Sequence, residues 1–330
     1  MVTRKPSGQS PRSQDSAYKR LFSHKDLVAD LIRGYVSPDL AKRFNLDSLE
    51  RCNGNYISQD LRGRENDLVW RLKVQKTWVY VYLLLEFQST VDRWMAVRLL
   101  GYIALLWQDL IAAKEITAEG TLPPVLPIVL YNGDRPWNAP IHLRDLIASP
   151  IDALAKFQPD LQYLFLDENH VPVEEGMELK NLAAAVFALE QCASPEAQLQ
   201  VVAALREWLK RRPDLQELLG TWAEEVLRPT GLIPPGKTAK ITLAKVESMM
   251  ATRILANIKE REAKSRAEGQ ALGKAEGEAK GKAEGMIAAI CRLVETGILS
   301  LDVARAQVKA LLKEHQISGK LAKDALGKLG

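Results

Sequence analysis

Hydrophobic and polar positions follow two different patterns along the first half of the chain, one typical of helices and one typical of strands. Apolar residues recur at helical spacing over residues 15–35 and 93–113, which predicts an amphipathic helix in each segment. Residues 67–74 and 77–86 are instead rich in β-branched and aromatic residues and are joined by the short turn QKT, which predicts an antiparallel hairpin.

Further strands are predicted on both sides of this hairpin. The predictions are a weak strand at 55–61, a buried strand at 125–131 before the Asn132-Gly133 turn, and another strand at 161–166. The resulting order is helix, three strands, helix, strand. It predicts an α/β fold in which a mixed sheet is flanked by helices.

The second half of the chain changes to helical spacing alone. Helices are predicted at 179–192, 197–211, 215–227 and, after the break TGLIPPG, at 238–261. Their apolar residues are typical of a helical core and show no pattern of catalytic residues.

A four-residue repeat follows, EGQALGKAEGEAKGKAEG, with glycine at positions 269, 273, 277, 281 and 285. Each interior glycine costs a helix about 1 kcal/mol relative to alanine, so the repeat predicts either a solvated linker or a marginal helix that is ordered by pairing. Two amphipathic stretches after it suit a helical hairpin or a contact in a homo-oligomer.

These patterns divide the chain into four parts. They are a flexible basic N-terminus (1–14), an α/β core (15–170), a helical region (171–262) and a tail with the repeat and the last helices (263–330).

Composition narrows the class of protein. With 47% hydrophobic and 26% charged residues, the chain is expected to be globular. The three cysteines and four histidines lack the spacing of a zinc site or a disulfide framework, and no apolar segment of about 18 residues is evident. We therefore expect a cytoplasmic protein that has no membrane partner.

The net charge of +4 is unevenly distributed, because both ends of the chain are basic and the middle is mildly acidic. Basic ends can attract a polyanion such as DNA, although the same charges also serve solubility.

An acidic residue stands at each of two neighbouring strand ends. Asp67 begins one strand of the hairpin and Glu86 ends the other, and in a tight antiparallel hairpin these two ends are neighbours. Convergent carboxylates suit Mg²⁺, with Gln88 on the same strand face and the backbone carbonyl of Phe87 as a further ligand. The alternative is that Asp67 and Glu86 are solvated acids at strand ends.

Five motifs follow one another over about residues 15–140. They are DSAYKRLF, END, LLLEFQS, RWMAVRLLGYIALLW and LPPVLPIVLYNG with Trp137. In this order they resemble the Rpn family of bacterial recombination-promoting nucleases, which are also labelled putative transposases or YhgA-like proteins. The resemblance implies a PD-(D/E)xK nuclease core that hydrolyses DNA with a divalent metal ion. It also implies that Asp67 is the first metal acid and Glu86 the second.

The resemblance also marks a departure. Gln88 occupies the position where most of the superfamily has lysine, and glutamine can orient a water molecule but brings no positive charge. Positive charge is then expected from Lys19, which follows Asp15 in a spacing like the family's D-x-x-F-K, or from Arg71 and Lys73 on the strand face of Asp67.

Each of these residues has an ordinary alternative role. Lys19 is otherwise a surface charge, and Asp15 is either a third acid or a helix cap. Arg98, in the helix after the hairpin, is either a buried ion-pair partner or a phosphate clamp.

The resulting hypothesis is a metal-dependent DNA endonuclease with low sequence specificity, since no base-reading motif is evident. A second hypothesis, from a different class, is a catalytically weak DNA-binding or assembly protein that keeps the nuclease fold. A transposase that uses three widely spaced acids fits the hairpin pair less well.

Overall fold

The computed structural model describes residues 11–52, 67–86, 91–133, 135–148, 152–234, 241–314 and 318–329. Contacts between residues divide the chain into two compact units, residues 1–254 and 255–330. The predicted core and helical region therefore lie in one unit, and the boundary near residue 170 does not separate two compact bodies.

A five-stranded mixed sheet is the centre of the first unit, in the order β1-β2-β3-β4-β5. The first three strands pair antiparallel, whereas β3–β4 and β4–β5 pair parallel. The strands are β1 (Asn45–Arg51), β2 (Asp67–Val74), β3 (Thr77–Glu86), β4 (Val125–Tyr131) and β5 (Leu164–Asp167). The predicted mixed sheet flanked by helices is confirmed.

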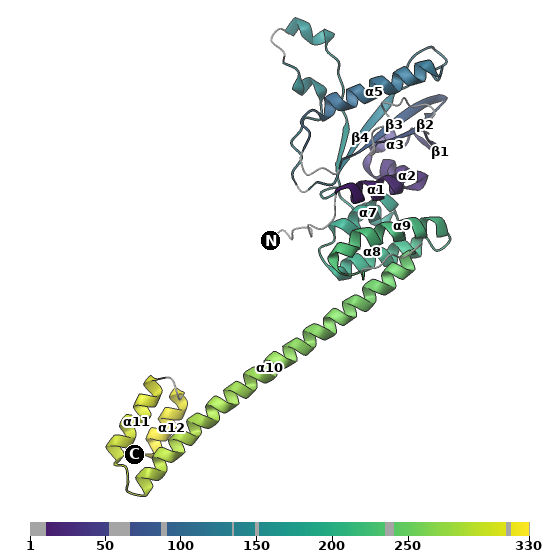
Figure 1. The fold of residues 1–330 in the computed structure, drawn as a ribbon. Coiled ribbons are helices and arrows are strands. Elements are labelled where there is room, and N and C mark those ends of the chain that lie inside the picture. The colour runs from purple at the N-terminus through teal and green to yellow at the C-terminus, as the bar shows by residue number, and fades with distance from the viewer. Residues whose placement is uncertain are drawn as a thin grey trace. The chain divides into compact units, whose positions relative to one another are not determined.

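Alternation along β2 and β3 directs side chains to two apolar layers, one on each face of the sheet. Leu68, Trp70 and Leu83 belong to the layer that contains α1 (Pro11–Phe22) and α2 (Lys25–Tyr35). Val69 and Tyr82 belong to the layer that contains α5 (Met95–Ala112). Figure 1 shows α5 on one side of the sheet and α1 and α2 on the other.

Helix α5 is long and apolar enough to cross a membrane by length and composition, contrary to the expectation from the sequence. Its apolar side chains have a partner within the fold, because Met95, Leu99, Ile103 and Leu106 are buried. The packing of α5 over the sheet accounts for its composition.

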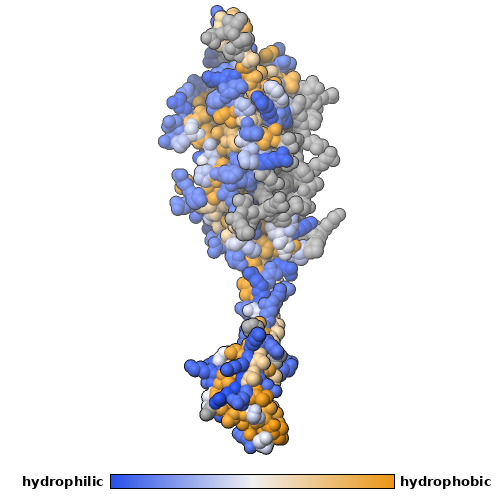
Figure 2. All heavy atoms as spheres, turned by 90° about the vertical axis from the view of Figure 1, so that its left-hand side faces the viewer, coloured by the Kyte–Doolittle hydropathy of each residue, from blue (hydrophilic) through white to orange (hydrophobic). Residues whose placement is uncertain are grey.

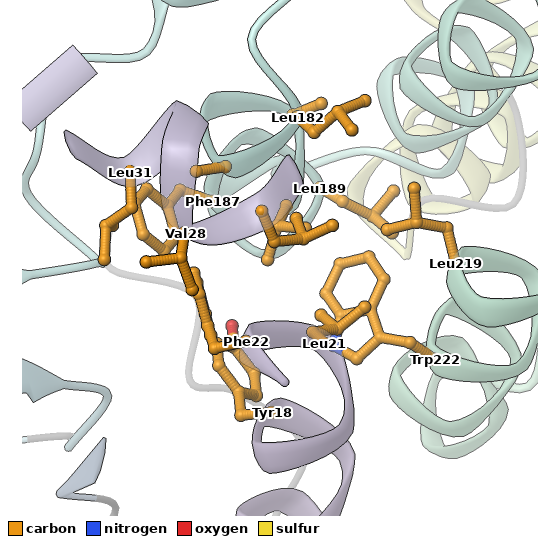
Figure 3. Close-up of a cluster of buried hydrophobic side chains, with 14 of the residues drawn as sticks. Tyr18, Leu21, Phe22, Val28, Leu31, Leu182, Phe187, Leu189, Leu219 and Trp222 are labelled. Atoms are coloured by element: carbon orange, nitrogen blue, oxygen red, sulfur yellow. The ribbon is translucent and has the colours of Figure 1, made fainter. Parts of the chain in front are cut away.

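The helical region packs against the α1 side of the first unit. Its helices are α6 (Glu174–Glu178), α7 (Leu182–Gln191), α8 (Pro195–Trp208) and α9 (Pro213–Leu227). Figure 3 shows side chains from α1, α2, α7 and α9 meeting in one cluster, which includes Tyr18, Phe187 and Trp222. The remaining short elements are α3 (Pro38–Ala41), η1 (Leu143–Leu146), η2 (Asp152–Phe157) and η3 (Arg228–Thr230).

Two predictions of elements were wrong in detail. The helix expected over 15–35 is two helices, because His24 caps α2 by accepting a hydrogen bond from the Asp26 backbone N–H. The strand expected at 161–166 is β5, which begins at Leu164. The strand predicted at 55–61 lies outside the described residues.

The repeat lies within one continuous helix, α10 (Leu243–Glu295), which begins in the first unit and continues into the second. Residues 258–282 of α10 are exposed. In the second unit, the end of α10, α11 (Leu301–Lys313) and α12 (Gly319–Lys328) share a small core that includes Ile287, Val308 and Ala325.

Candidate active site

The register of the hairpin places Asp67 and Glu86 on the same face of the sheet. Asp67 pairs with Leu84, which lies two positions before Glu86 in β3. Positions two apart in a strand share a face, and such diagonal neighbours are about 7–8 Å apart. The structure therefore brings these two positions together at the level of the backbone. The side chains of both lie outside the described residues.

The same edge of the sheet continues through the next two strands. Glu86 pairs with Tyr131, and Tyr131 pairs with Asp167 at the end of β5. The Asp167 carboxylate accepts a hydrogen bond from the Asn169 backbone N–H (3.1 Å) and contacts His170 Nδ1 at 2.8 Å. Asp167 thus stabilises the turn after β5. Sequence reasoning did not select it, although its position at a strand end is the same signal that selected Glu86.

Arg98 on α5 forms an ion pair on the side of the sheet that carries Asp67 and Glu86. Arg98 Nη1 lies 2.9 Å from Asp92 Oδ2, and Arg98 Nε donates to the Tyr102 hydroxyl at 3.2 Å. The Tyr102 ring packs on Tyr82, with 5.7 Å between ring centroids. Arg98 is therefore an ion-pair partner, as one of the two interpretations of the sequence held, but its side chain is 36% exposed and not buried as that interpretation expected.

Arg71 and Lys73 share the face of Asp67 but lie far along β2. Arg71 is four positions from Asp67, about 13 Å at the usual strand rise, and Lys73 is farther. Arg71 is bound by Glu115 (2.7 Å) and Glu50 (3.0 Å), and both cations stack on the Trp78 ring. The structure does not bring either residue to the two carboxylate positions.

Lys19 lies on α1, which packs against the opposite face of the sheet. It is partly buried, and it is adjacent to Tyr18, whose hydroxyl contacts the end of α7. Lys19 therefore lies on the side of the sheet opposite to the face that carries Asp67 and Glu86. The side chain of Asp15 and all of Phe87 and Gln88 lie outside the described residues.

Two of the three cysteines, Cys52 and Cys192, are poor candidates for a nucleophile. Burial raises the pKa of the Cys52 thiol to about 12, and burial also raises the pKa of Cys192. A thiol with a raised pKa stays protonated at neutral pH and is a poor nucleophile.

The register of the hairpin places the positions of two acids, Asp67 and Glu86, diagonally on one strand face. Carboxylates at diagonal positions on one strand face can share a hard cation such as Mg²⁺. Among the described residues, no group of three or more His, Cys, Asp or Glu residues is arranged to hold a metal ion.

Residues 12–219, more than half of the chain, match the model of the family described as "Putative transposase, YhgA-like". The chain belongs to this family. The match extends beyond the sheet into the helices α7, α8 and the start of α9. For the YhgA-like family, the helical region is thus part of the shared domain, in agreement with its packing in the first unit.

Curated relatives of this YhgA-like protein carry two kinds of name. Recombination-promoting nuclease RpnD of Escherichia coli O157:H7 is 28% identical over 172 residues, which are 51% of this chain and 64% of that protein. Recombination-promoting nuclease RpnC of Escherichia coli K12 is 26% identical over 176 residues, 53% of this chain and 56% of that protein.

A third relative from Escherichia coli K12 is named inactive recombination-promoting nuclease-like protein RpnE. It is 24% identical over 170 residues, which are 51% of this chain and 55% of that protein. The matched part covers less than two thirds of each of these three relatives. No solved structure matches the chain.

Proposed function

We propose that this protein is a metal-dependent DNA endonuclease that promotes recombination and cleaves phosphodiester bonds with low sequence specificity in the cytoplasm. The observation that supports it best is the register of the hairpin, which places Asp67 and Glu86 diagonally on one face at the end of β3. The names of the relatives RpnD and RpnC agree with this proposal.

Each residue of the proposed site has a separate role. Asp67, Glu86 and the backbone carbonyl of Phe87 hold a divalent ion, most simply Mg²⁺, which when bound lowers the pKa of a coordinated water and stabilises charge on the phosphate. Gln88 orients the attacking water by hydrogen bonds. Lys19, reaching around the edge of the sheet, contacts the phosphate of the DNA.

The second candidate is a catalytically weak DNA-binding or assembly protein. Two observations favour it, namely glutamine at position 88 and the name of the inactive relative RpnE. In this case the fold would bind DNA without cleaving it.

Incubation of the purified chain with supercoiled plasmid separates the two functions. We expect nicking with Mg²⁺ or Mn²⁺ that EDTA abolishes, because attack on the phosphate needs the metal-activated water. An Asp67→Asn variant purified in the same way controls for contaminating nucleases. Binding to the plasmid without nicking under every metal condition would favour the second candidate.

Self-association through the C-terminal helices is a further part of the proposal. The second unit exposes Ile298 (74%), Leu301 (49%) and Val303 (48%), and Figure 2 shows apolar residues gathered on this unit. Exposed apolar residues that cluster in this way favour contact with a partner, here a second copy of the chain.

Deleting residues 262–330 is expected to lower the molecular mass measured by light scattering from that of an oligomer to that of a monomer. Metal-dependent nicking should persist, because the candidate site and its supporting core lie in the first unit. A milder variant, Ile298→Asp, should have the same effect on mass. If the particles of both variants contain as many chains as those of the full-length protein, the C-terminal helices do not form the contact.

A further inference from the structure

The carboxylate of Glu190 joins two segments that are distant in the sequence. Glu190 lies at the end of α7 and accepts a hydrogen bond from the Tyr18 hydroxyl at Oε1 (2.6 Å) and one from Asn132 Nδ2 at Oε2 (3.1 Å). Tyr18 is fully buried on α1, and Asn132, which directly follows β4, is 7% exposed. A single side chain from the helical region therefore fixes both α1 and the end of β4.

The next residue of α7 fixes the end of β5. Gln191 Nε2 donates to the backbone carbonyls of Glu168 (2.7 Å) and Val171 (2.9 Å). The Glu168 backbone N–H in turn donates to the carbonyl of Tyr131 (3.0 Å), the residue that pairs with Glu86. The end of α7 is thus connected, through two strand ends, to the strand position that carries the second candidate metal acid.

The Tyr18 hydroxyl stays protonated and can therefore donate a hydrogen bond. Burial raises the pKa of Tyr18 well above its usual value, and the nearby Glu168 and Glu190 raise it further. The hydroxyl therefore stays protonated across the range in which a nuclease works, and its hydrogen bond to a carboxylate is of the stronger, charge-assisted kind.

We propose that Glu190 is a positioning residue of the candidate nuclease site, which fixes α1 and the end of β4 and thereby the end of β3 that carries Glu86. Metal affinity then depends on a helix outside the sheet. This inference rests on the proposed function, because it assumes that Asp67 and Glu86 hold the metal ion.

Three substitutions in the full-length chain test the contact. Glu190→Ala removes both hydrogen bonds. Tyr18→Phe removes one and keeps the aromatic ring, which packs on Phe22 and on the edge of Trp222 with centroid distances of 6.1 and 6.3 Å. Glu190→Gln retains both contacts, because an amide can accept from Asn132 and pair with the Tyr18 hydroxyl, which both donates and accepts.

A matched control is available between the same two regions. Arg20 on α1 pairs with Glu225 on α9 at 2.6 Å, and both side chains are more than a third exposed. Glu225→Ala therefore removes a link between α1 and the helical region that does not involve Glu190.

The measurement is the Kd for Mn²⁺ by isothermal titration calorimetry, together with the Mg²⁺ concentration that gives half-maximal nicking. Glu190→Ala and Tyr18→Phe should weaken metal binding by about tenfold, as is typical when an outer residue that orients a metal ligand is lost. Glu190→Gln and Glu225→Ala should stay within about twofold of the unmodified chain, because the contacts at the strand ends persist.

Each other outcome has a definite meaning. If Tyr18→Phe folds and binds Mn²⁺ as tightly as the unmodified chain, Glu190 does not position the site. Equal weakening in Glu225→Ala or in Glu190→Gln also overturns the inference. An Asp67→Asn variant separates the proposed metal site from the proposed role of Glu190. Unchanged Mn²⁺ binding in Asp67→Asn overturns the metal site itself. If only Asp67→Asn loses Mn²⁺ binding, the role of Glu190 alone is overturned.

Discussion

Replacing Asp67 by Asn or Glu86 by Gln is expected to lower the rate of metal-dependent nicking by about a thousandfold or more. Each change removes one of two carboxylates that the hairpin register places on one face. A hard cation left with a single protein carboxylate binds weakly and is poorly positioned to activate water. Initial rates of plasmid nicking at saturating Mg²⁺ measure the effect.

The fold should survive both changes, because the pairing of β2 with β3 is made by backbone groups and the new side chains have nearly the same size. Glu50→Gln is a matched control. Glu50 is an exposed carboxylate on β1 that binds Arg71, and Arg71 keeps its contact with Glu115 when Glu50 is neutralised. A folded Asp67→Asn or Glu86→Gln protein that nicks as fast as Glu50→Gln would show that the acids are not metal ligands.

The elements that local pattern specifies were predicted well. The two hairpin strands and β4 have the predicted bounds, because runs of β-branched and aromatic residues between turn residues carry a strong local signal. Strand β1 was missed because its sequence, NLDSLER, has a single buried side chain, Leu49. A strand at the sheet edge with so little apolar alternation resembles a loop in sequence.

For the candidate site, too, the sequence predicts the local contacts and not the distant ones. The nearness of Asp67 and Glu86 follows from a tight hairpin, so sequence alone predicts it. The alternation of side chains also predicted that Arg71 and Lys73 share the face of Asp67, but the sequence does not show that Glu50 and Glu115 bind Arg71.

Contacts made across the fold left no signal in the sequence. Glu190 meets residues 172 and 58 positions away, and its helix shows only the apolar spacing of a core. For that reason the helical region was interpreted as packing alone, although its end contacts the strand ends next to the candidate site.

Replacing Trp222 by Ala is expected to lower the free energy of unfolding of the first unit by about 3–5 kcal/mol, the usual cost of removing a large buried aromatic side chain. Trp222 is 1% exposed on α9 and packs edge-on against Tyr18 of α1. Figure 3 shows its ring in the cluster that joins these helices to α2 and α7. The loss therefore leaves a cavity where the helical region meets the layer under the sheet.

Urea unfolding followed by tryptophan fluorescence measures this loss in the first unit alone, because all seven tryptophans of the chain precede residue 255. Trp222→Phe should cost about 1.5 kcal/mol or less, since a ring remains and Trp222 Nε1 has no hydrogen-bond acceptor among the described residues to lose. Trp94→Ala, at a position that is 55% exposed, should change stability by about 0.5 kcal/mol or less. If Trp222→Ala is as stable as Trp94→Ala, the helical region does not unfold together with the sheet, and a role for α7 in holding the strand ends loses its structural basis.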